Sequence, residues 1–296
     1  MFETGSKRKN PNFRKGRGLI GFMKESEAVQ MMSLGDPGSI DGCRAKYSSA
    51  TEAVKTAVTI SGTYMTDIGS EYNTYLTQVS STPVFQQAFH GTNYQFKLVE
   101  IDNLTCYQRW VDLDYVEELQ RQLSSDPLDV LKFCLPTTFP VKAAISAEPQ
   151  SSAITIASNS PNVLVTGLSF GQPYPDSAPT VTFTLGTNAN YVQVVKYHHQ
   201  FIVKNGHHRL YALRDQGSNV SPCLYSEITD YSLTGGDRPG FFPRDIVLSD
   251  RSPRMKDFFD SRVSAEIKIQ PTVNVIRLKA EQFLMPVLTD VAQMGV

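Results

Sequence analysis

The spacing of apolar residues changes along the chain and separates helical from extended stretches. Over residues 48–79 the apolar side chains recur at steps of three or four, which predicts helix, although many Ser and Thr residues and two glycines weaken the pattern. From Tyr94, the stretch YQFKLVEIDNL alternates between apolar and polar residues, which predicts a strand. The following VDLDYVEELQRQL has one apolar face and Asp112 or Asp114 as N-cap, so we expect a helix there.

The second half of the chain predicts mainly short strands. VLKFCLPTTFPVKAAISA is typical of a buried extended stretch, with its prolines at the margins of the apolar runs. Over residues 148–190, Ser, Thr, Asn, Pro and Gly separate short apolar runs, which indicates a hairpin-rich insertion. YVQVVKY and HQFIVKN predict a hairpin that leads directly into a helix over GHHRLYALRDQG. A short helix around RMKDFFD and three further strands are also expected, over VSPCLYSEI, AEIKIQ and VNVIRLKA.

Composition narrows the class of protein. The 296 residues can bury a sizeable core, and the formal net charge of −1 gives no global attraction to nucleic acid or to an anionic membrane. No apolar run approaches the roughly 20 residues of a membrane span, and no signal-peptide core follows the basic N-terminus. The four cysteines lie far apart, which argues against a zinc knuckle and a disulfide framework. We therefore expect a reduced, cytoplasmic protein with no membrane partner.

One strongly basic segment lies near the N-terminus. Residues 1–40 are rich in Gly, Lys, Arg and Asn, and are more typical of an arm than of a core. Such an arm can neutralise nucleic-acid phosphates, and a solubilising or assembly arm is an equally good interpretation. The stretch GSKRKNPNFRKGRG contains no acidic residue and six cations: Lys7, Arg8, Lys9, Arg14, Lys15 and Arg17.

The segment FIVKNGHHRLYALRDQG carries the most distinctive chemistry. Gly206 removes the Cβ where a strand turns into a helix, and the first residues of that helix leave backbone N–H groups free. Such a helix start favours an anion, and phosphate is the natural ligand, because Arg209 adds a bidentate contact and the two histidines add donors. An ordinary structural corner stays open as an alternative. A zinc site is disfavoured, because adjacent histidines on a strand point to opposite faces.

The order of these segments resembles that of the ParB/sulfiredoxin-like superfamily. FKLVEIDNLTCYQRWVDLDYVEELQRQL is similar to its opening strand, loop and helix, QFIVKNGHHRLYALRDQG to its nucleotide-phosphate turn, and VSPCLYSEI to the strand that follows. The resemblance covers residues 94–229 and is interrupted by the insertion. It implies an α+β fold, namely a mixed sheet with flanking helices, to which this chain adds a β-hairpin insertion and N- and C-terminal extensions.

The resemblance also implies a ligand. Relatives in this superfamily bind ATP or CTP through the turn, and some are ATP-dependent enzymes, so a nucleotide with Mg²⁺ is the expected cofactor. By position, the residues that would surround the phosphates are Gly206, His207, His208 and Arg209, and those of the first loop that would face the same pocket are Gln108 and Arg109.

This chain departs from its relatives at informative positions. Sulfiredoxins have a catalytic Cys where His207 stands, so sulfinic-acid chemistry is not expected. Free-serine kinases resemble the Gly-His-His-Arg turn but usually place Asp where this chain has Asn205. ParB partition proteins have Glu and Arg in place of the two histidines and continue into helix-turn-helix segments, which the sequence after Asp230 does not resemble. A complete partition protein is therefore not expected.

Carboxylates decide whether such a scaffold could be an enzyme. A phosphotransferase or phosphohydrolase needs a base and usually a Mg²⁺ ligand. Glu100 and Asp102, at the end of the first strand, are the best-placed catalytic candidates, although carboxylates at strand ends are often merely solvated. Asp112 is better explained as a helix cap, and Trp110 as a core anchor. The mixed charges of DRSPRMKDFFDSR are typical of a solvated surface.

The chain is thus expected to have three parts: a basic arm with a helical extension (1–90), a ParB/sulfiredoxin-like domain (91–235) that contains the insertion, and a C-terminal extension (236–296). The leading hypothesis is a nucleotide-binding protein, with phosphohydrolase or phosphotransferase activity left open. The alternative is a non-catalytic structural protein that keeps the fold and either self-associates as a homo-oligomer or binds nucleic acid through its arm. Large additions at both ends favour the alternative, whereas the Gly-His-His-Arg turn favours the first.

Overall fold

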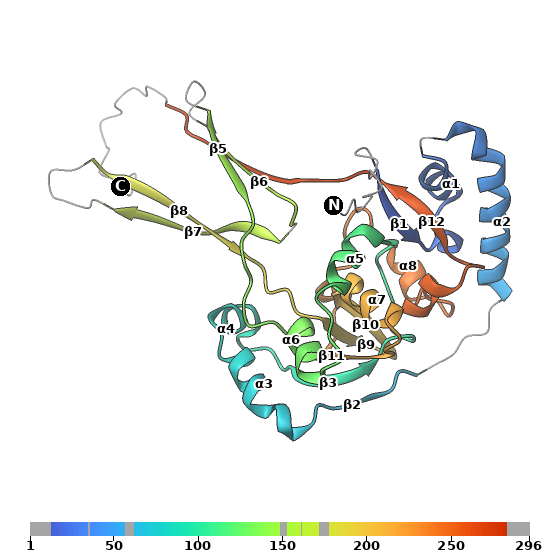
Figure 1. Cartoon of the computed structure of the whole chain (residues 1–296), viewed down its shortest axis with the longest axis horizontal. Helices are drawn as coiled ribbons and strands as arrows, with labels where there is room; N and C mark the ends of the chain where they lie inside the picture. The colour runs from blue at the N-terminus through green and yellow to red at the C-terminus, as the bar shows by residue number, and fades with distance from the viewer. Residues whose placement is uncertain are drawn as a thin grey trace, which may run out of the picture. The chain divides into compact units, whose positions relative to one another are not determined.

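The computed structural model describes residues 13–34, 36–56, 62–148, 153–160, 162–171 and 178–282. These residues form an α+β protein with eight α-helices and four small sheets, so the expected mixture of helix and strand is confirmed (Figure 1). The chain divides into two compact units, the first containing Met1–Phe139 and Ala189–Pro271, the second Pro140–Asn188 and Thr272–Val296. Each unit is therefore built from two separate stretches of chain.

The first unit contains a five-stranded sheet. Its members are β2 (Met65–Asp67), β3 (Gln95–Glu100), β9 (Gln193–Tyr197), β10 (Gln200–Asn205) and β11 (Val220–Ile228). The order is β10-β9-β11-β3-β2, with β11 parallel to β9 and every other pair antiparallel. The β9–β10 hairpin expected from the sequence is present. Because β9 and β11 are parallel, the chain crosses between them through β10 and the helix that follows it.

A second sheet corrects the expected basic arm. It joins β1 (Arg14–Gly18), β4 (Trp110–Asp112) and β12 (Ala265–Ile269), with β1 in the centre. Arg14, Lys15 and Arg17 therefore belong to a paired strand, and the fully buried Leu19 and Ile20 follow it. A Cβ at Gly16 would lie 2.3 Å from Ile269 Cδ1, so the glycines that suggested an arm allow close strand packing. Lys7, Arg8 and Lys9 lie outside the described residues.

The helical pattern of residues 48–79 is only partly helix. The N-terminal helices are α1 (Glu25–Ser33), α2 (Ile40–Thr56), α3 (Asn73–Ser80) and α4 (Pro83–Phe89). Between α2 and α3, residues 57–61 are not described and β2 forms an edge strand, so the expected helix is interrupted. At α4, the Thr82 hydroxyl accepts from the Phe85 amide at 3.3 Å, and Pro83 occupies the first turn.

Two capped helices follow β4. They are α5 (Leu113–Gln120) and α6 (Pro127–Cys134). The Asp112 carboxylate accepts from the Tyr115 amide at 3.0 Å, which confirms Asp112 as the N-cap of α5. The start of VLKFCLPTTFPVKAAISA was expected to be extended, but VLKFC belongs to α6. Asp126 caps that helix by accepting from the Leu128 amide at 2.8 Å, and this upstream aspartate, with Pro127, is the helix start signal.

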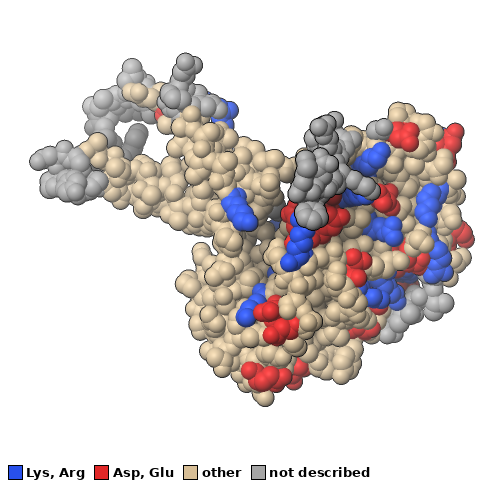
Figure 2. All heavy atoms as spheres, in the orientation of Figure 1, with Lys and Arg blue, Asp and Glu red and all other residues tan. Residues whose placement is uncertain are grey.

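The remaining helices of the first unit are short. Two are α-helices, α7 (His207–Asp215) and α8 (Arg244–Val247), and five are 3₁₀ turns: Ile20–Phe22, Pro37–Ser39, Ser70–Tyr72, Tyr231–Thr234 and Met255–Phe259. The longest described helix is α2, with 17 residues, and no described helix is both long and apolar enough to cross a membrane. Lys and Arg alternate with Asp and Glu over the face of this unit seen in Figure 2.

The second unit consists of strands. A three-stranded sheet has the order β13-β6-β5, and a two-stranded ribbon pairs β7 with β8. These strands are β5 (Ala144–Glu148), β6 (Ala153–Ser158), β7 (Val163–Gly171), β8 (Thr180–Thr187) and β13 (Asn274–Lys279). Because β13 pairs with β6, residues of the expected C-terminal extension and of the expected insertion share one sheet.

Candidate functional site

The turn between β10 and α7 has the backbone geometry that its sequence suggests. Gly206 has φ +98°, in the left-handed region, and a Cβ there would lie 3.0 Å from Val192 Cγ2. Glycine is therefore required both by conformation and by close packing. The first hydrogen bond of α7 runs from the Leu210 amide to the Gly206 carbonyl at 2.9 Å. Among the described residues, the amides of residues 207–209 have no acceptor, so they form the free donor end of a nine-residue helix.

His207 lies at the first position of α7 and is buried, with 4% of its surface exposed. Its ring packs edge-on against Tyr107, with 5.1 Å between ring centroids. Burial, with a smaller contribution from His208, lowers the pKa of His207 to about 3, so the imidazole is neutral at pH 7. Its Nε2 is buried and has no hydrogen-bond partner in the described structure, which leaves a polar atom unsatisfied beside the helix start.

His208 has a structural partner. Its Nε2 accepts a hydrogen bond from the Asp112 amide at 2.9 Å, and its ring packs edge-on against Tyr115. The accepting nitrogen carries no proton, so it cannot donate to a phosphate. Burial, Arg14 and Arg209 lower the pKa of His208 to about 4. His208 was expected to donate a hydrogen bond to phosphate, but its Nε2 accepts one from the chain. The imidazole thereby connects α7 to the start of α5.

Arg209 is also occupied within the chain. Its Nη1 donates to the carbonyls of Phe133 and Cys134, both at 3.2 Å, and its Nη2 donates to Asn190 Oδ1 at 2.9 Å. Only 6% of its surface is exposed. The two carbonyls belong to the last turn of α6, where helical acceptors lack partners within the helix. The expected bidentate phosphate contact is therefore replaced by a link between α6 and α7.

The first-loop residues Gln108 and Arg109 face a different segment. Arg109 Nη1 pairs with Glu27 Oε1 at 2.5 Å, and its Nη2 donates to the Phe241 carbonyl at 2.6 Å. Gln108 forms an isolated backbone bridge with Phe241. The residue just before them reaches the turn instead, because the Tyr107 hydroxyl donates to the Lys204 carbonyl. Sequence reasoning missed Tyr107, although an aromatic residue beside the two expected residues was a visible signal.

The expected catalytic carboxylates lie at the other end of α7. Asp102 accepts from Arg214 in two contacts, Oδ1 to Nε at 2.7 Å and Oδ2 to Nη2 at 3.2 Å. Arg214 lies in the last turn of this nine-residue helix, about 10 Å along its axis from the first residue. Glu100 accepts from Asn103 Nδ2 at 3.1 Å and from Asn219 Nδ2 at 3.4 Å. Neither carboxylate is placed to act as a base at the amino end of the helix.

Lys204 adds an uncompensated charge next to the turn. The register of the β9–β10 hairpin shifts between Val203 and Asn205, so Lys204 lies at a bulge two residues before Gly206. Its ammonium is half-buried and has no hydrogen bond or ion pair with a described residue. Burial lowers the pKa of Lys204. The sequence alone did not identify this lysine as a site residue, because nothing in the strand sequence QFIVKN reveals that the pairing register shifts at Lys204.

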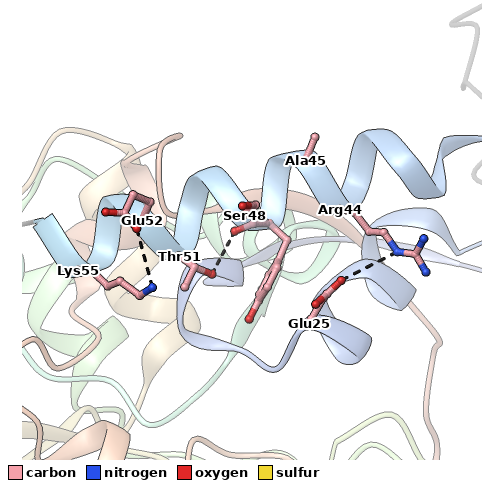
Figure 3. Close-up of a pocket in the computed structure, with 8 residues that line it drawn as sticks. Glu25, Arg44, Ala45, Ser48, Thr51, Glu52 and Lys55 are labelled. Atoms are coloured by element: carbon pink, nitrogen blue, oxygen red, sulfur yellow. Dashed lines mark hydrogen bonds and ion pairs between the residues drawn. The ribbon is translucent and has the colours of Figure 1, made fainter.

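A surface depression lined by residues of α1 and α2 offers no comparable chemistry. It lies along α1 and α2 (Figure 3), and its charges pair with one another: Arg44 Nε lies 3.9 Å from Glu25 Oε1, and Lys55 Nζ lies 3.8 Å from Glu52 Oε2. All four side chains are mostly exposed, and pairs of this kind are worth about 1 kcal/mol or less. We therefore interpret it as an ordinary solvated surface.

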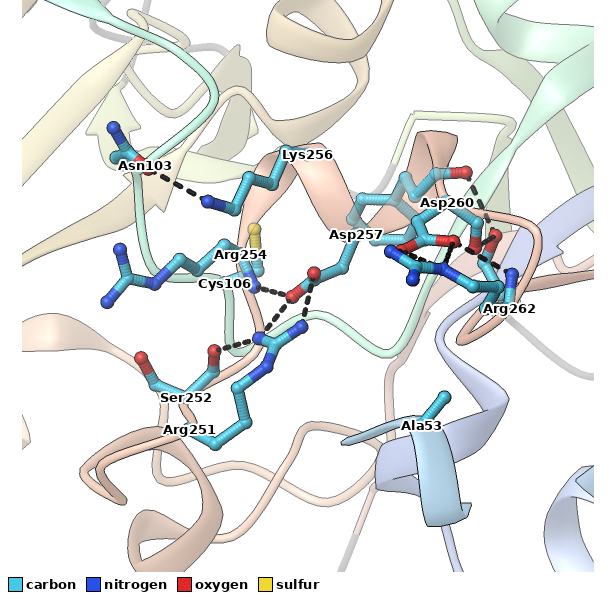
Figure 4. Close-up of polar contacts among 12 residues, drawn as sticks. Ala53, Asn103, Cys106, Arg251, Ser252, Arg254, Lys256, Asp257, Asp260 and Arg262 are labelled. Atoms are coloured by element: carbon cyan, nitrogen blue, oxygen red, sulfur yellow. Dashed lines mark hydrogen bonds and ion pairs between the residues drawn. The ribbon is translucent and has the colours of Figure 1, made fainter. Parts of the chain in front are cut away.

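The charged segment DRSPRMKDFFDSR is not a simple solvated surface (Figure 4). Asp257 is 2% exposed and accepts from Arg251 in two contacts, at 2.8 and 2.6 Å, and from the Arg254 amide at 2.8 Å. Met255 and Phe258 of the same segment are fully buried. Charge pattern alone could not reveal this, because a buried carboxylate depends on partners that only the fold brings together.

Comparisons of the chain with protein-family models, with curated proteins and with solved structures found no match. The resemblance to the ParB/sulfiredoxin-like superfamily thus stays an expectation from sequence motifs.

Proposed function

We propose that the chain binds the phosphate groups of a nucleotide, ATP or CTP, at the amino end of α7. One observation carries the proposal: the left-handed Gly206 is followed by three amides without acceptors and by a buried His207 Nε2 without a partner, all within the described structure. Phosphate oxygens accept from donors of this kind, and the partial positive charge of a helix start favours an anion. The buried His207 Nε2 costs free energy while it has no partner, and a hydrogen bond from this nitrogen to a phosphate oxygen would remove that cost.

Lys204 supports the same ligand. A half-buried ammonium without an acid partner is costly, and a nearby phosphate would provide the missing counter-charge. The pKa of this lysine, which burial lowers, would rise when the anion binds.

The proposed site adds Lys204 to the set expected by resemblance and leaves out four side chains of that set: His208, Arg209, Gln108 and Arg109. Arg209 and His208 hold α6, α7 and the start of α5 together, and the phosphate contacts come from the backbone, His207 and Lys204. A site that binds phosphate mainly through backbone amides fits the sequence as well as one built from side chains. The left-handed conformation of Gly206 leaves the first amides of α7 free to donate.

The proposal is binding, without a catalytic step. Glu100 and Asp102 lie at the opposite end of α7 and are engaged by Asn103, Asn219 and Arg214. The described residues contain no group of three or more His, Cys, Asp or Glu side chains that could hold a metal ion. Most ligands of the Mg²⁺ that the resemblance implies would therefore have to come from the nucleotide phosphates and water. Glu100 and Asp102, the expected catalytic carboxylates, are therefore not placed to act as a base at the proposed phosphate position.

Calorimetric titration with ATP, CTP, GTP and UTP tests the proposal. At least one nucleotide should bind, and Lys204→Met should weaken that binding by about tenfold or more, since a hydrogen bond to a charged group contributes about 1.5–3 kcal/mol. Lys196→Met is the matched control: it removes the same charge from the neighbouring strand, where the lysine pairs with Glu227 at 3.2 Å. Absence of binding by any nucleotide contradicts the proposal.

A further inference from the structure

The second unit carries most of the large apolar side chains that the described residues leave in solvent. Of thirteen such side chains, nine belong to this unit, so the exposure is concentrated there. Contiguous exposed apolar surface in a protein of ordinary composition marks a surface that another molecule covers. The nine residues are Val141, Ile145, Ile154, Leu168, Phe170, Val181, Phe183, Val273 and Val275.

Four of these side chains share one face of the β7–β8 ribbon. Leu168 pairs with Phe183, and Phe170 pairs with Val181, two residues further along both strands. Because alternate residues of a strand point to the same side, these four form one apolar face. From residue 167 to residue 171 of β7, the opposite face carries only Ser, Thr and Gly. The exposed fractions are 53% for Leu168, 77% for Phe170, 53% for Val181 and 40% for Phe183.

The arrangement of this apolar face is self-complementary. The two phenylalanines lie on one diagonal of the four-residue patch, and the aliphatic residues, Leu168 and Val181, lie on the other. When a second identical patch is turned over by a two-fold axis parallel or perpendicular to the strands, each phenylalanine lies opposite an aliphatic side chain. An isologous contact of this kind brings the same patch of both copies together.

The ribbon also lacks the features that prevent self-association. Neither β7 nor β8 contains a charged residue or a proline. Native edge strands commonly carry Lys or Pro to block pairing with other chains. A charged partner would lose the hydration of its charges against this surface without gaining an ion pair, whereas an uncharged, apolar partner has no such desolvation penalty.

A two-stranded ribbon is also marginally stable in water unless its apolar face is covered. We propose that a second copy of this chain covers it, through face-to-face packing of the two β7–β8 ribbons about a two-fold axis. The packing would follow that of sheets in a β-sandwich, with the two faces about 10 Å apart and Phe170 of each copy seated against the aliphatic residues of the other. This inference is independent of the proposed phosphate site, since it involves only the second unit.

Sedimentation equilibrium of the full chain tests it. The parent should form dimers at micromolar concentration, and Phe170→Ser with Phe183→Ser should weaken the dimer at least tenfold. Leu233→Ser is the matched control, because this leucine of the first unit has the same exposed fraction, 53%, as Leu168. The control should dimerise like the parent.

A second variant guards against misfolding of the double serine variant. Val181→Lys keeps both phenylalanines and places a charge on the patch of each copy, so it should also give monomers while the circular dichroism spectrum stays that of the parent. A parent that is monomeric at concentrations on the order of 100 μM, where even a weak micromolar dimer would form, overturns the proposal. Dimers that persist in both patch variants overturn it equally.

Discussion

Arg209 donates from Nη2 to the side-chain oxygen of Asn190 at 2.9 Å. The same guanidinium reaches two carbonyls at the end of α6, so one buried cation joins α6, α7 and the segment that precedes β9. Asn190 Oδ1 also accepts from Asn205 Nδ2 at 3.2 Å. A neutral amide oxygen thus takes the position at Arg209 where a phosphate oxygen was expected.

Arg209→Ala should therefore act on stability. Removing the guanidinium takes one donor from each of three acceptors in a buried region, and we expect a loss of about 3 kcal/mol in the free energy of unfolding. Urea unfolding monitored by circular dichroism measures this loss. Arg121→Ala, at an exposed position after α5, should change the free energy by about 0.5 kcal/mol or less. Equal stability of the two variants would show that Arg209 is not a structural link.

The buried histidines should make the fold sensitive to acid. The pKa of His207 is lowered to about 3 and that of His208 to about 4, against an ordinary value near 6.5 in the unfolded chain. The unfolded state therefore binds more protons, and the stabilisation present above pH 6.5 is lost as the pH falls through the range between 6.5 and the folded values. For each histidine we expect a loss of about 2 kcal/mol between pH 6.5 and 5.

Urea unfolding at several pH values tests this dependence. His207→Leu is close in size and has no titrating proton, so its free energy of unfolding should fall less steeply between pH 6.5 and 5. A slope identical to that of the parent would contradict the low pKa of His207. Both imidazoles stay neutral well below pH 6.5, so their protonation should not strengthen nucleotide binding between pH 6.5 and 5.

Truncation should separate the basic segment into two parts. Deleting residues 1–18 removes β1, which pairs with both β4 and β12 and whose Arg14 Nε lies 3.0 Å from Asp112 Oδ2. We expect a large loss of stability, with a thermal midpoint at least several degrees lower. Deleting residues 1–12 keeps the strand and should leave the midpoint close to that of the parent. Similar midpoints for the two truncations would contradict the central place of β1 in its sheet.

Asp102→Asn checks the role of the expected catalytic carboxylate. The ion pair with Arg214 is partly exposed, so its loss should cost about 1 kcal/mol of stability and leave nucleotide affinity unchanged. Asp129→Asn, in an exposed pair with Lys132 on α6, is the matched control and should cost less. A tenfold loss of nucleotide affinity in Asp102→Asn would return this residue to the site.

Local signals in the sequence predicted local structure well. The cap at Asp112, the β9–β10 hairpin and the helix after Gly206 follow from residues that lie within a few positions of each other. The α6 helix was missed because its apolar run is short, and short apolar runs do not distinguish strand from helix.

Long-range partners could not be predicted in this way. Arg209 meets the end of α6 across 75 residues of chain, and β1 meets β12 from the opposite end of the chain. Both are decided by tertiary packing, so a residue type that suits phosphate became a structural link. Glu100 and Asp102 were the expected catalytic residues because they lie at the end of the first strand. The fold places them at the carboxyl end of α7, whereas the proposed phosphate position is at its amino end.

The most direct test of the phosphate site is an NMR titration of the backbone amides with ATP and, separately, with inorganic phosphate. We predict that the amide signals of residues 206–209 shift, together with that of Lys204, and that the amide signals of residues 213–215 at the other end of α7 do not shift. Saturating shifts at a different group of residues, or no shift at the start of α7, would contradict it.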